Sequence, residues 1–145
     1  MGISLQPINH SNWLECIALQ VNDDQKPFII TNLYSLAEAK AHPSFVPLAI
    51  YHDNVMVGFT MYGIDPGDGR YWVYRLMIDK KHQRQGYGKE AMLRVLDKLR
   101  VIRDCHEITI GHKSENYIAD RLYSSLGFKN TGEIIEGEII KCLEI

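Results

Sequence analysis

The short stretch 83–88, Gln-Arg-Gln-Gly-Tyr-Gly, constrains the fold more than any other part of this chain. It follows an apolar run at 72–78 that is typical of a strand, and it precedes a segment whose apolar residues have helical spacing. The N-terminus of a helix carries unpaired backbone N–H groups and a partial positive charge, and therefore attracts anions. Gly86 and Gly88 allow the main chain to approach an anion closely. The sequence therefore predicts a phosphate-binding turn.

Composition limits the classes of protein that the chain can belong to. At 145 residues, 46% hydrophobic and with a net charge of −2, it is expected to form one domain over 1–145. It has no basic block and no long apolar run, so neither nucleic-acid nor membrane partners are expected. Cys16, Cys105 and Cys142 are far apart and odd in number, which favours reduced thiols and a cytoplasmic location. The histidine spacing indicates no metal site.

Periodicity predicts an α/β fold with a sheet of mixed direction and helices on both faces. Asn12 with Glu15, and Ser35 with Glu38, resemble capping boxes that would begin the first two helices. The other helices are expected after 88 and after 114. Strands are expected at 3–7, 46–51, 55–62, 71–78, 107–110, 129–135 and 138–143.

The turn does not fit the usual nucleotide-binding fingerprints. It lacks the spacing G-x-G-x-x-G and the P-loop pattern, and it lies past the middle of the chain. It does resemble the acetyl-CoA signature of the GNAT superfamily of N-acetyltransferases, [RQ]-x-x-G-x-[GA]. Two further matches have the right order and spacing: Leu76-Met77-Ile78 upstream, and a downstream pattern that contains Asn116, Ala119, Leu122, Tyr123, Gly127 and Phe128.

The resemblance implies a mostly antiparallel sheet of about six to seven strands, splayed between the fourth and fifth strands, and an acetyl-CoA-dependent N-acetyltransferase. Dimers are common in that family, so a homodimer is one expected assembly. The open edge of the fourth strand would bind the pantetheine arm, and the turn would bind the pyrophosphate. These roles imply a cofactor site made of Leu76, Met77, Ile78, Gln83, Arg84, Gln85, Gly86, Tyr87, Gly88, Lys89 and Asn116.

The same resemblance implies that Tyr123 is the acid that protonates the leaving thiolate. A tyrosine on a partly apolar helix can also be a core residue, and Asn116 can also cap its own helix. Some family members have a glutamate on the fourth strand as the base, where this chain has about Trp72, so the sequence leaves the base unassigned. A non-catalytic domain that only binds acyl-CoA is the alternative from another functional class.

Two runs, 32–39 and 72–79, resemble small bacterial GNAT enzymes assigned to spermine and spermidine. A small-molecule amine, and specifically a polyamine, is therefore the expected acceptor; a protein N-terminus, an amino acid or an aminoglycoside is the alternative. Carboxylates and aromatic faces would hold alkylammonium groups. Trp72 and Tyr74 share a strand face that we expect to continue at Leu76. The candidate acceptor residues are Asp23, Asp24, Tyr34, Glu38, Trp72 and Tyr74.

Overall fold

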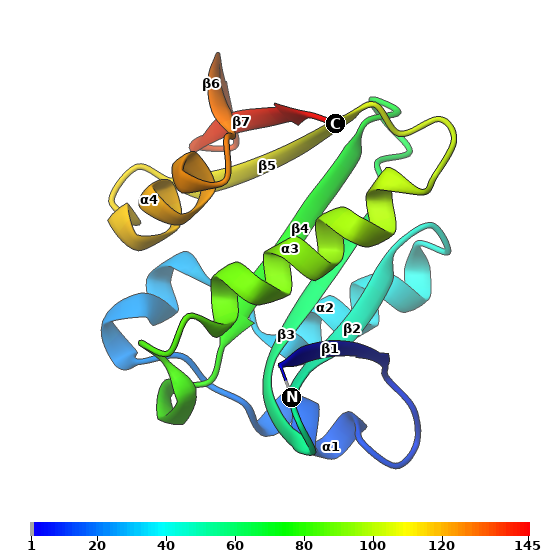
Figure 1. Ribbon diagram of the computed structural model, residues 1–145, viewed down its shortest axis with the longest axis vertical. Coiled ribbons are helices and arrows are strands. Elements are labelled where there is room, and N and C mark those ends of the chain that lie inside the picture. The colour runs from blue at the N-terminus through cyan, green and yellow to red at the C-terminus, as the bar shows by residue number, and fades with distance from the viewer. Residues whose placement is uncertain (1) are drawn as a thin grey trace.

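The computed structural model describes residues 2–145, which form a seven-stranded sheet with helices packed against it (Figure 1). No helix in this described part is long and apolar enough to cross a membrane. The elements are β1 (Ile3–Pro7), α1 (Trp13–Ala18), η1 (a 3-10 helix, Asp23–Phe28), α2 (Asn32–Ala41), β2 (Val46–His52), β3 (Val55–Ile64), β4 (Tyr71–Ile78), η2 (a 3-10 helix, Lys80–His82), α3 (Tyr87–Arg100), β5 (Glu107–Lys113), α4 (Tyr117–Ser125), β6 (Lys129–Ile135) and β7 (Glu138–Glu144).

The strand order is β1-β2-β3-β4-β5-β7-β6. The neighbouring strands are antiparallel except for β4 and β5, which run parallel. A parallel pair needs a crossover connection, and α3 supplies it. The predicted fold class, a mixed and mostly antiparallel sheet of six to seven strands, is confirmed.

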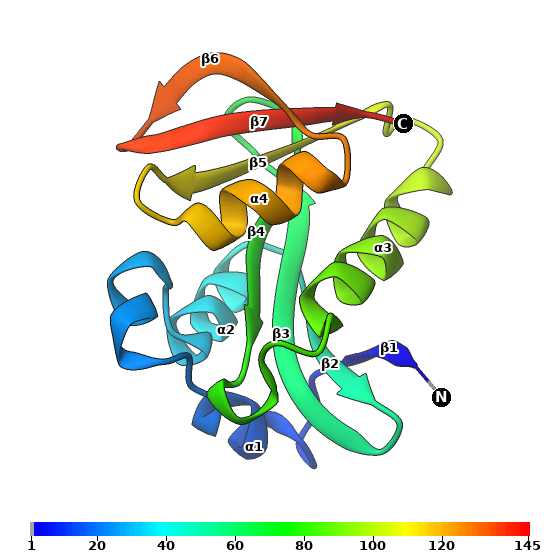
Figure 2. The ribbon, with the colours of Figure 1, turned by 60° about the vertical axis from the view of Figure 1, so that its left-hand side comes forward.

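Helices cover both faces of the sheet, as predicted (Figure 2). On one face, α3 contributes Met92, Val95 and Leu96 to a core cluster that includes Ile108 of β5, and α4 packs against this cluster. On the other face, α1 and α2 cover a second cluster around Phe59. Each helix therefore buries its apolar stripe against the sheet, which is what its periodicity predicts.

Strands β4 and β5 separate part-way along their length. Tyr71–Val73 pairs with 108–110, and beyond this point β4 has no β5 partner. Strand β5 instead continues beside β7, where Gly111 lies opposite Ile140 and Lys113 opposite Glu138 (Figure 2). The expected strand at 107–110 was therefore too short, because its last three residues are supported by β7 alone.

A β-bulge lies on β4 where the two strands part. Met61 pairs with Arg75 and Tyr62 pairs with Val73, which leaves Tyr74 as an extra residue. The bulge turns two consecutive side chains toward α2: Tyr74 packs into the α1–α2 cluster, and Arg75 contacts α2. Leu76 packs on the α3 face. The prediction that the face of Tyr74 continues at Leu76 was therefore wrong.

Both predicted capping boxes were also wrong. Helix α2 begins earlier than expected, because the hydroxyl of Thr31 accepts a hydrogen bond from Tyr34 N and caps it. Ser35 lies inside this helix and is fully buried. The side chain of Asn12 bonds the loop before α1, where its Oδ1 accepts from Asn9 N, so it makes no cap hydrogen bond to the helix. The hydroxyl of Ser35 instead donates to the carbonyl of Thr31 at 3.1 Å, and Asn12 occupies the N-cap position of α1 without a side-chain cap.

Candidate active site

The turn between β4 and α3 has the backbone shape of an anion site. Gly86 is the N-cap of α3 and is left-handed, with φ of 80°, and Arg84 is also left-handed, with φ of 65°. The first turn of α3 leaves the N–H groups of residues 87–89 without a protein acceptor in the described chain. Left-handed residues next to a helix start gather such N–H groups into a concave nest that suits phosphate.

The two glycines of the turn differ in whether a larger residue could replace them. Gly86 has open space around it, and its positive φ alone excludes larger residues. Gly88 has no positive φ, and a methyl group there would lie 3.7 Å from Ile78 and 3.8 Å from Leu122, which is ordinary contact. Position 88 therefore admits alanine, whereas position 86 does not without strain.

Gln83 uses its side chain to hold the turn in place. Its Nε2 donates to the carbonyl of Ile78 at 2.9 Å and to Gln25 Oε1 at 2.8 Å, and its Oε1 accepts from Asn22 at 3.0 Å. The side chain therefore ties the end of β4 to η1. Gln83 therefore supports an anion site by fixing the conformation of the main chain in the turn.

The edge of β4 that faces the gap can bind an extended ligand. The carbonyl of Arg75 points toward β3, where it accepts from the hydroxyl of Thr60 at 2.8 Å. Alternate residues of a strand direct their backbone groups to opposite sides, so those of Leu76 point to the open edge. This edge lies after the bulge, where β5 has already separated. An extended arm could pair with Leu76 as an added strand.

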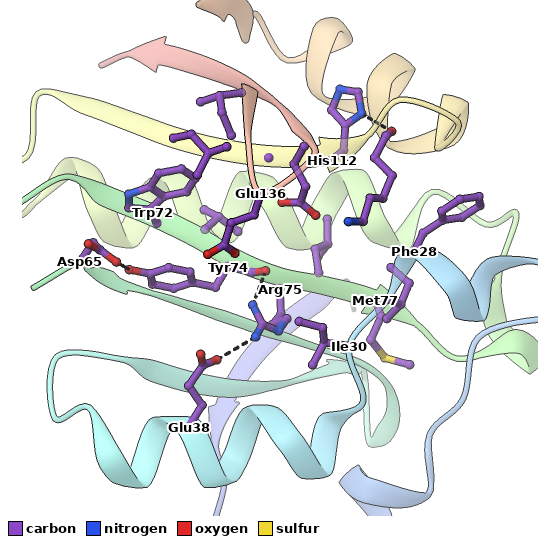
Figure 3. A pocket seen from close by; sticks show the side chains of 18 of the residues that line it. Phe28, Ile30, Glu38, Asp65, Trp72, Tyr74, Arg75, Met77, His112 and Glu136 are labelled. Atoms are coloured by element: carbon purple, nitrogen blue, oxygen red, sulfur yellow. Dashed lines mark hydrogen bonds and ion pairs between the residues drawn. The ribbon is translucent and has the colours of Figure 1, made fainter. Parts of the chain in front are cut away.

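A cavity of about 780 Å³ lies on the α2 side of β4 and reaches β5 and the β6–β7 hairpin (Figure 3). Its walls carry aromatic faces: Trp72 and Tyr74 are stacked, with ring centroids 6.1 Å apart, and Phe45 lies against Tyr74. Tyr34 and Phe28 line the same cavity. Among the residues predicted to hold the acceptor, Tyr34, Glu38, Trp72 and Tyr74 are thus brought together.

One predicted acceptor carboxylate is already engaged. Glu38 Oε1 lies 2.7 Å from Arg75 Nη2, and Arg75 also donates to Ser35 Oγ at 3.0 Å and to the carbonyl of Tyr74 at 3.0 Å (Figure 3). The largely buried guanidinium therefore has its charge balanced within the protein. Arg75 could not be assigned to the site from sequence, because the bulge that turns it toward α2 leaves no local signal.

Asp65 and Asp68 are two carboxylates of the β3–β4 loop that line the cavity and were not among the predicted acceptor residues. Tyr74 Oη donates to Asp65 at 3.2 Å, and Trp72 Nε1 donates to Asp68 at 3.2 Å. Burial, followed by the charge of Asp65, raises the pKa of Tyr74, which stays a neutral donor. The loop is fixed to β6 by a bidentate pair between Arg70 and Glu133, with both distances 3.0 Å.

The acidic residues of η1 lie elsewhere. Asp24 is exposed and does not line the cavity, and Asp23 pairs with Lys26 at 2.9 Å on the surface. Phe28 and Ile30, a few residues later, do line it. The short 3-10 helix therefore presents its apolar end to the cavity and its acidic start to solvent.

Tyr123 is a core residue that also reaches the cavity. It is 7% exposed, and its ring packs near His112 and Phe128, with centroids 6.2 and 6.0 Å away. Burial, and then the charge of Glu138, raises the pKa of Tyr123, so the phenol is protonated at neutral pH and can act only as an acid. Its hydroxyl has no hydrogen-bond partner within residues 2–145, which leaves it available to a ligand.

Helix α4, which carries Tyr123, is fixed at its start and in its middle. The side chain of Asn116 caps it by accepting from Ala119 N at 3.3 Å, and Asn116 also lines the cavity. Asp120 pairs with the buried Lys141 of β7 at 2.9 Å, which lowers the pKa of Asp120. This pair holds the helix against the sheet and fixes the direction of Tyr123.

Comparison with known proteins identifies the family. The model of the acetyltransferase (GNAT) family matches residues 9–128. The chain belongs to the GNAT acetyltransferase family. This match confirms the resemblance, and with it the enzyme class and the acetyl-CoA donor that the motifs implied. Separately, no group of residues within 2–145 is arranged to hold a metal.

Similar GNAT proteins include enzymes named for polyamines. The chain is 30% identical, over the whole of both chains, to a probable spermine N(1)-acetyltransferase of Bacillus subtilis subsp. natto. It is 29% identical, also over the full length, to the spermine/spermidine N(1)-acetyltransferase of Bacillus subtilis strain 168. The structure of spermidine N-acetyltransferase from Vibrio cholerae, with CoA and spermine, superimposes with a TM-score of 0.75 at 18% identity, covering 99% of this chain and 94% of that one.

Proposed function

We propose that this GNAT enzyme transfers the acetyl group of acetyl-CoA to a primary amine of a polyamine such as spermidine or spermine. The observation that carries the proposal is the cavity beside β4, whose walls combine carboxylates with flat aromatic faces. Alkylammonium groups bind to carboxylates by charge-assisted hydrogen bonds and to aromatic faces by cation–π attraction. The names of the two Bacillus relatives support the same acceptor class.

The donor would occupy the other side of the gap. The N–H groups of 87–89 would hold the pyrophosphate, and the pantetheine arm would pair with the open edge at Leu76. The backbone N–H of Leu76, which points to this open edge, would then face the thioester oxygen and stabilise the oxyanion. Tyr123 would protonate the departing thiolate, because its raised pKa keeps the phenolic proton in place.

The charges of the cavity favour a cationic acceptor. Glu38 and Arg75 neutralise each other. The remaining charged side chains that line the cavity in the described chain are four carboxylates and one lysine: Asp65, Asp68, Glu136, Glu138 and Lys113. This excess of negative charge attracts a polyamine, and it disfavours acceptors that carry a carboxylate next to the amine. The amine would attack the thioester directly in a ternary complex.

An acceptor panel tests the proposal. Purified protein is mixed with acetyl-CoA and, separately, spermine, spermidine, an amino acid, a short peptide and an aminoglycoside, and free CoA is followed with a thiol reagent. The protein's own thiols should contribute little background, because burial raises the pKa of Cys16 and of Cys142 to about 12 and also raises that of Cys105.

We expect release of CoA with the polyamines above the rate of hydrolysis. Release with peptides or aminoglycosides but not with spermidine would overturn the polyamine proposal and keep the enzyme. Binding of acetyl-CoA without turnover of any amine would instead indicate a binding domain.

A further inference from the structure

The acceptor amine must lose a proton before it can attack. Alkylammonium groups have a pKa near that of lysine, about 10, so few are neutral at pH 7. Three of the carboxylates that line the cavity are already bound by protein donors: Glu38 by Arg75, Asp65 by Tyr74, and Asp68 by Trp72. Glu136 and Glu138 have no hydrogen bond or ion pair within residues 2–145. These two glutamates are therefore better candidates for a base than the three bound carboxylates.

The two glutamates differ in their surroundings. Glu136 lies in the turn between β6 and β7, is exposed, and has φ of 50°. Glu138 is the first residue of β7, is half-buried, and lies opposite Lys113 of β5. A carboxylate that is partly shielded from water and fixed on a strand is better suited to proton transfer than one at the tip of a turn.

Gly111 of β5 makes room for the Glu138 carboxylate. A methyl group at position 111 would lie 2.7 Å from Glu138 Oε1 and 3.1 Å from Ile140 Cδ1. The carboxylate therefore lies against the bare backbone of β5, just beyond the residues that still pair with β4. Both Gly111 and Glu138 line the cavity at this point. The missing side chain thus lets an acid reach the opening between β4 and β5 from the β5 wall.

We propose, resting on the acetyl transfer proposed above, that Glu138 is the general base that accepts the proton of the acceptor ammonium, directly or through one water molecule. The neutral amine then forms a bond to the thioester carbonyl carbon, its nitrogen gives up a second proton to water, and the C–S bond breaks as the tetrahedral intermediate collapses. The thiolate takes a proton from Tyr123, which regains one from solvent, and Glu138 releases its proton to water. Each turnover yields the acetylated amine, free CoA and one proton.

The groups around Glu138 fit this division of roles. Tyr123 of α4 and Glu138 of β7 line the same cavity. After burial, the charge of Glu138 is the second cause that raises the pKa of Tyr123. The other titratable side chains that line this end of the cavity are Lys113 and His112 of β5 and Glu136 of the turn. His112 Nδ1 contacts the carbonyl of Lys113 at 2.8 Å, and its Nε2 faces Asp120 of α4 at 3.8 Å.

The first test compares Glu138→Gln with Glu144→Gln, using the best amine from the acceptor panel. We expect Glu138→Gln to lower kcat at neutral pH by about 100-fold or more, the usual contribution of a general base. Glu144 is an exposed carboxylate of the same strand that does not line the cavity, so Glu144→Gln should leave kcat and the acceptor KM within about twofold. Acetyl-CoA affinity and thermal midpoint, measured for both variants, report on folding and on the donor site.

A pH series distinguishes a base from a binding residue. Near pH 10 a large share of the amine is already neutral in solution, so a base is no longer needed. The ratio of wild-type to Glu138→Gln turnover should therefore shrink steadily as pH rises toward about 10. A ratio that stays constant with pH would overturn the proposal.

Gly111→Ala supplies an independent probe that leaves Glu138 in place. The added methyl group displaces the carboxylate, so we expect a smaller loss of kcat, about tenfold, in the same direction. In the double variant with Glu138→Gln, the alanine should cause no further loss, because the group it displaces is already inactive. Fully additive losses would contradict the proposed contact.

The outcomes are distinguishable from failure of the proposed function. If wild-type protein acetylates no amine, the function itself fails before Glu138 is tested. If wild type is active and Glu138→Gln retains its kcat while only the acceptor KM rises, Glu138 is a binding residue and the base proposal fails.

Discussion

The proposed donor and acceptor halves of the active site are built from different parts of the chain. The donor half is made of main chain: N–H groups at the start of α3 and the open edge of β4, shaped by the left-handed Gly86. The acceptor half is made of side chains, contributed by η1, α2, β4, the β3–β4 loop and the β6–β7 hairpin. The first depends on backbone conformation and the second on which residues occupy the walls.

Because of this difference, the same acetyl-transfer chemistry can be combined with sites for different amines. A main-chain site tolerates almost any side chain outside a few special positions, so it can be kept while the rest of the sequence changes. The side-chain walls can be replaced without moving the thioester. Tyr123 lies where the two halves meet, because it packs on the face of the sheet that α3 and α4 cover and also lines the acceptor cavity.

The largest expected effect is at this junction. Tyr123→Phe keeps the ring that packs near His112 and Phe128 and removes the phenolic proton. We expect kcat to fall by about 100-fold with unchanged acetyl-CoA affinity, because an acid acts only in the transition state. Tyr117→Phe is the matched control, since Tyr117 is exposed on the same helix. Equal kcat for both variants would remove Tyr123 from the chemistry.

The main-chain character of the donor half can be tested with its two glycines. Gly86→Ala places a side chain in a left-handed conformation that costs about 1–2 kcal/mol, so acetyl-CoA should bind about fivefold to thirtyfold more weakly. The exposed turn can relax without unfolding the domain, so the thermal midpoint should change little. Gly88→Ala should bind normally, because its methyl group has room. Calorimetric titration with CoA measures both, and similar weakening at the two positions would contradict the distinction.

The proposed donor half follows from the sequence because its determinants are local. The turn 83–88 and the strand residue Leu76 lie within one short stretch, and the downstream pattern around Tyr123 lies within one helix. Their spacing along the chain is also their arrangement in space. The splay of β4 from β5 followed from the same resemblance, and the parallel pairing that ends at Val73 confirms it.

The acceptor half could not be predicted in the same way, because its contacts join distant residues. Arg75 meets Glu38 across 37 positions of sequence, and the bulge at Tyr74 that makes this contact has no local signature. Asp65 has a clear local function in its own turn, where its Oδ2 accepts from Gly67 N at 2.9 Å. Its contact with the Tyr74 hydroxyl in the cavity wall has no such local pattern. Such pairs become visible only once the sheet register is known.

The smallest effect tests whether single charges on the acceptor wall matter. Asp65→Asn removes one charge from a partly exposed site and keeps the shape that accepts the Tyr74 hydroxyl. An exposed pair contributes about 0.2–1 kcal/mol, so the KM for spermidine should rise by up to about fivefold, with acetyl-CoA affinity unchanged. A simple monoamine lacks the second ammonium group that would contact this wall, so its KM should rise less than that of spermidine. Asp23→Asn, on η1 outside the cavity, is the matched control. Equal increases in KM for spermidine and the monoamine would show that Asp65 shapes the loop and does not bind the second ammonium group.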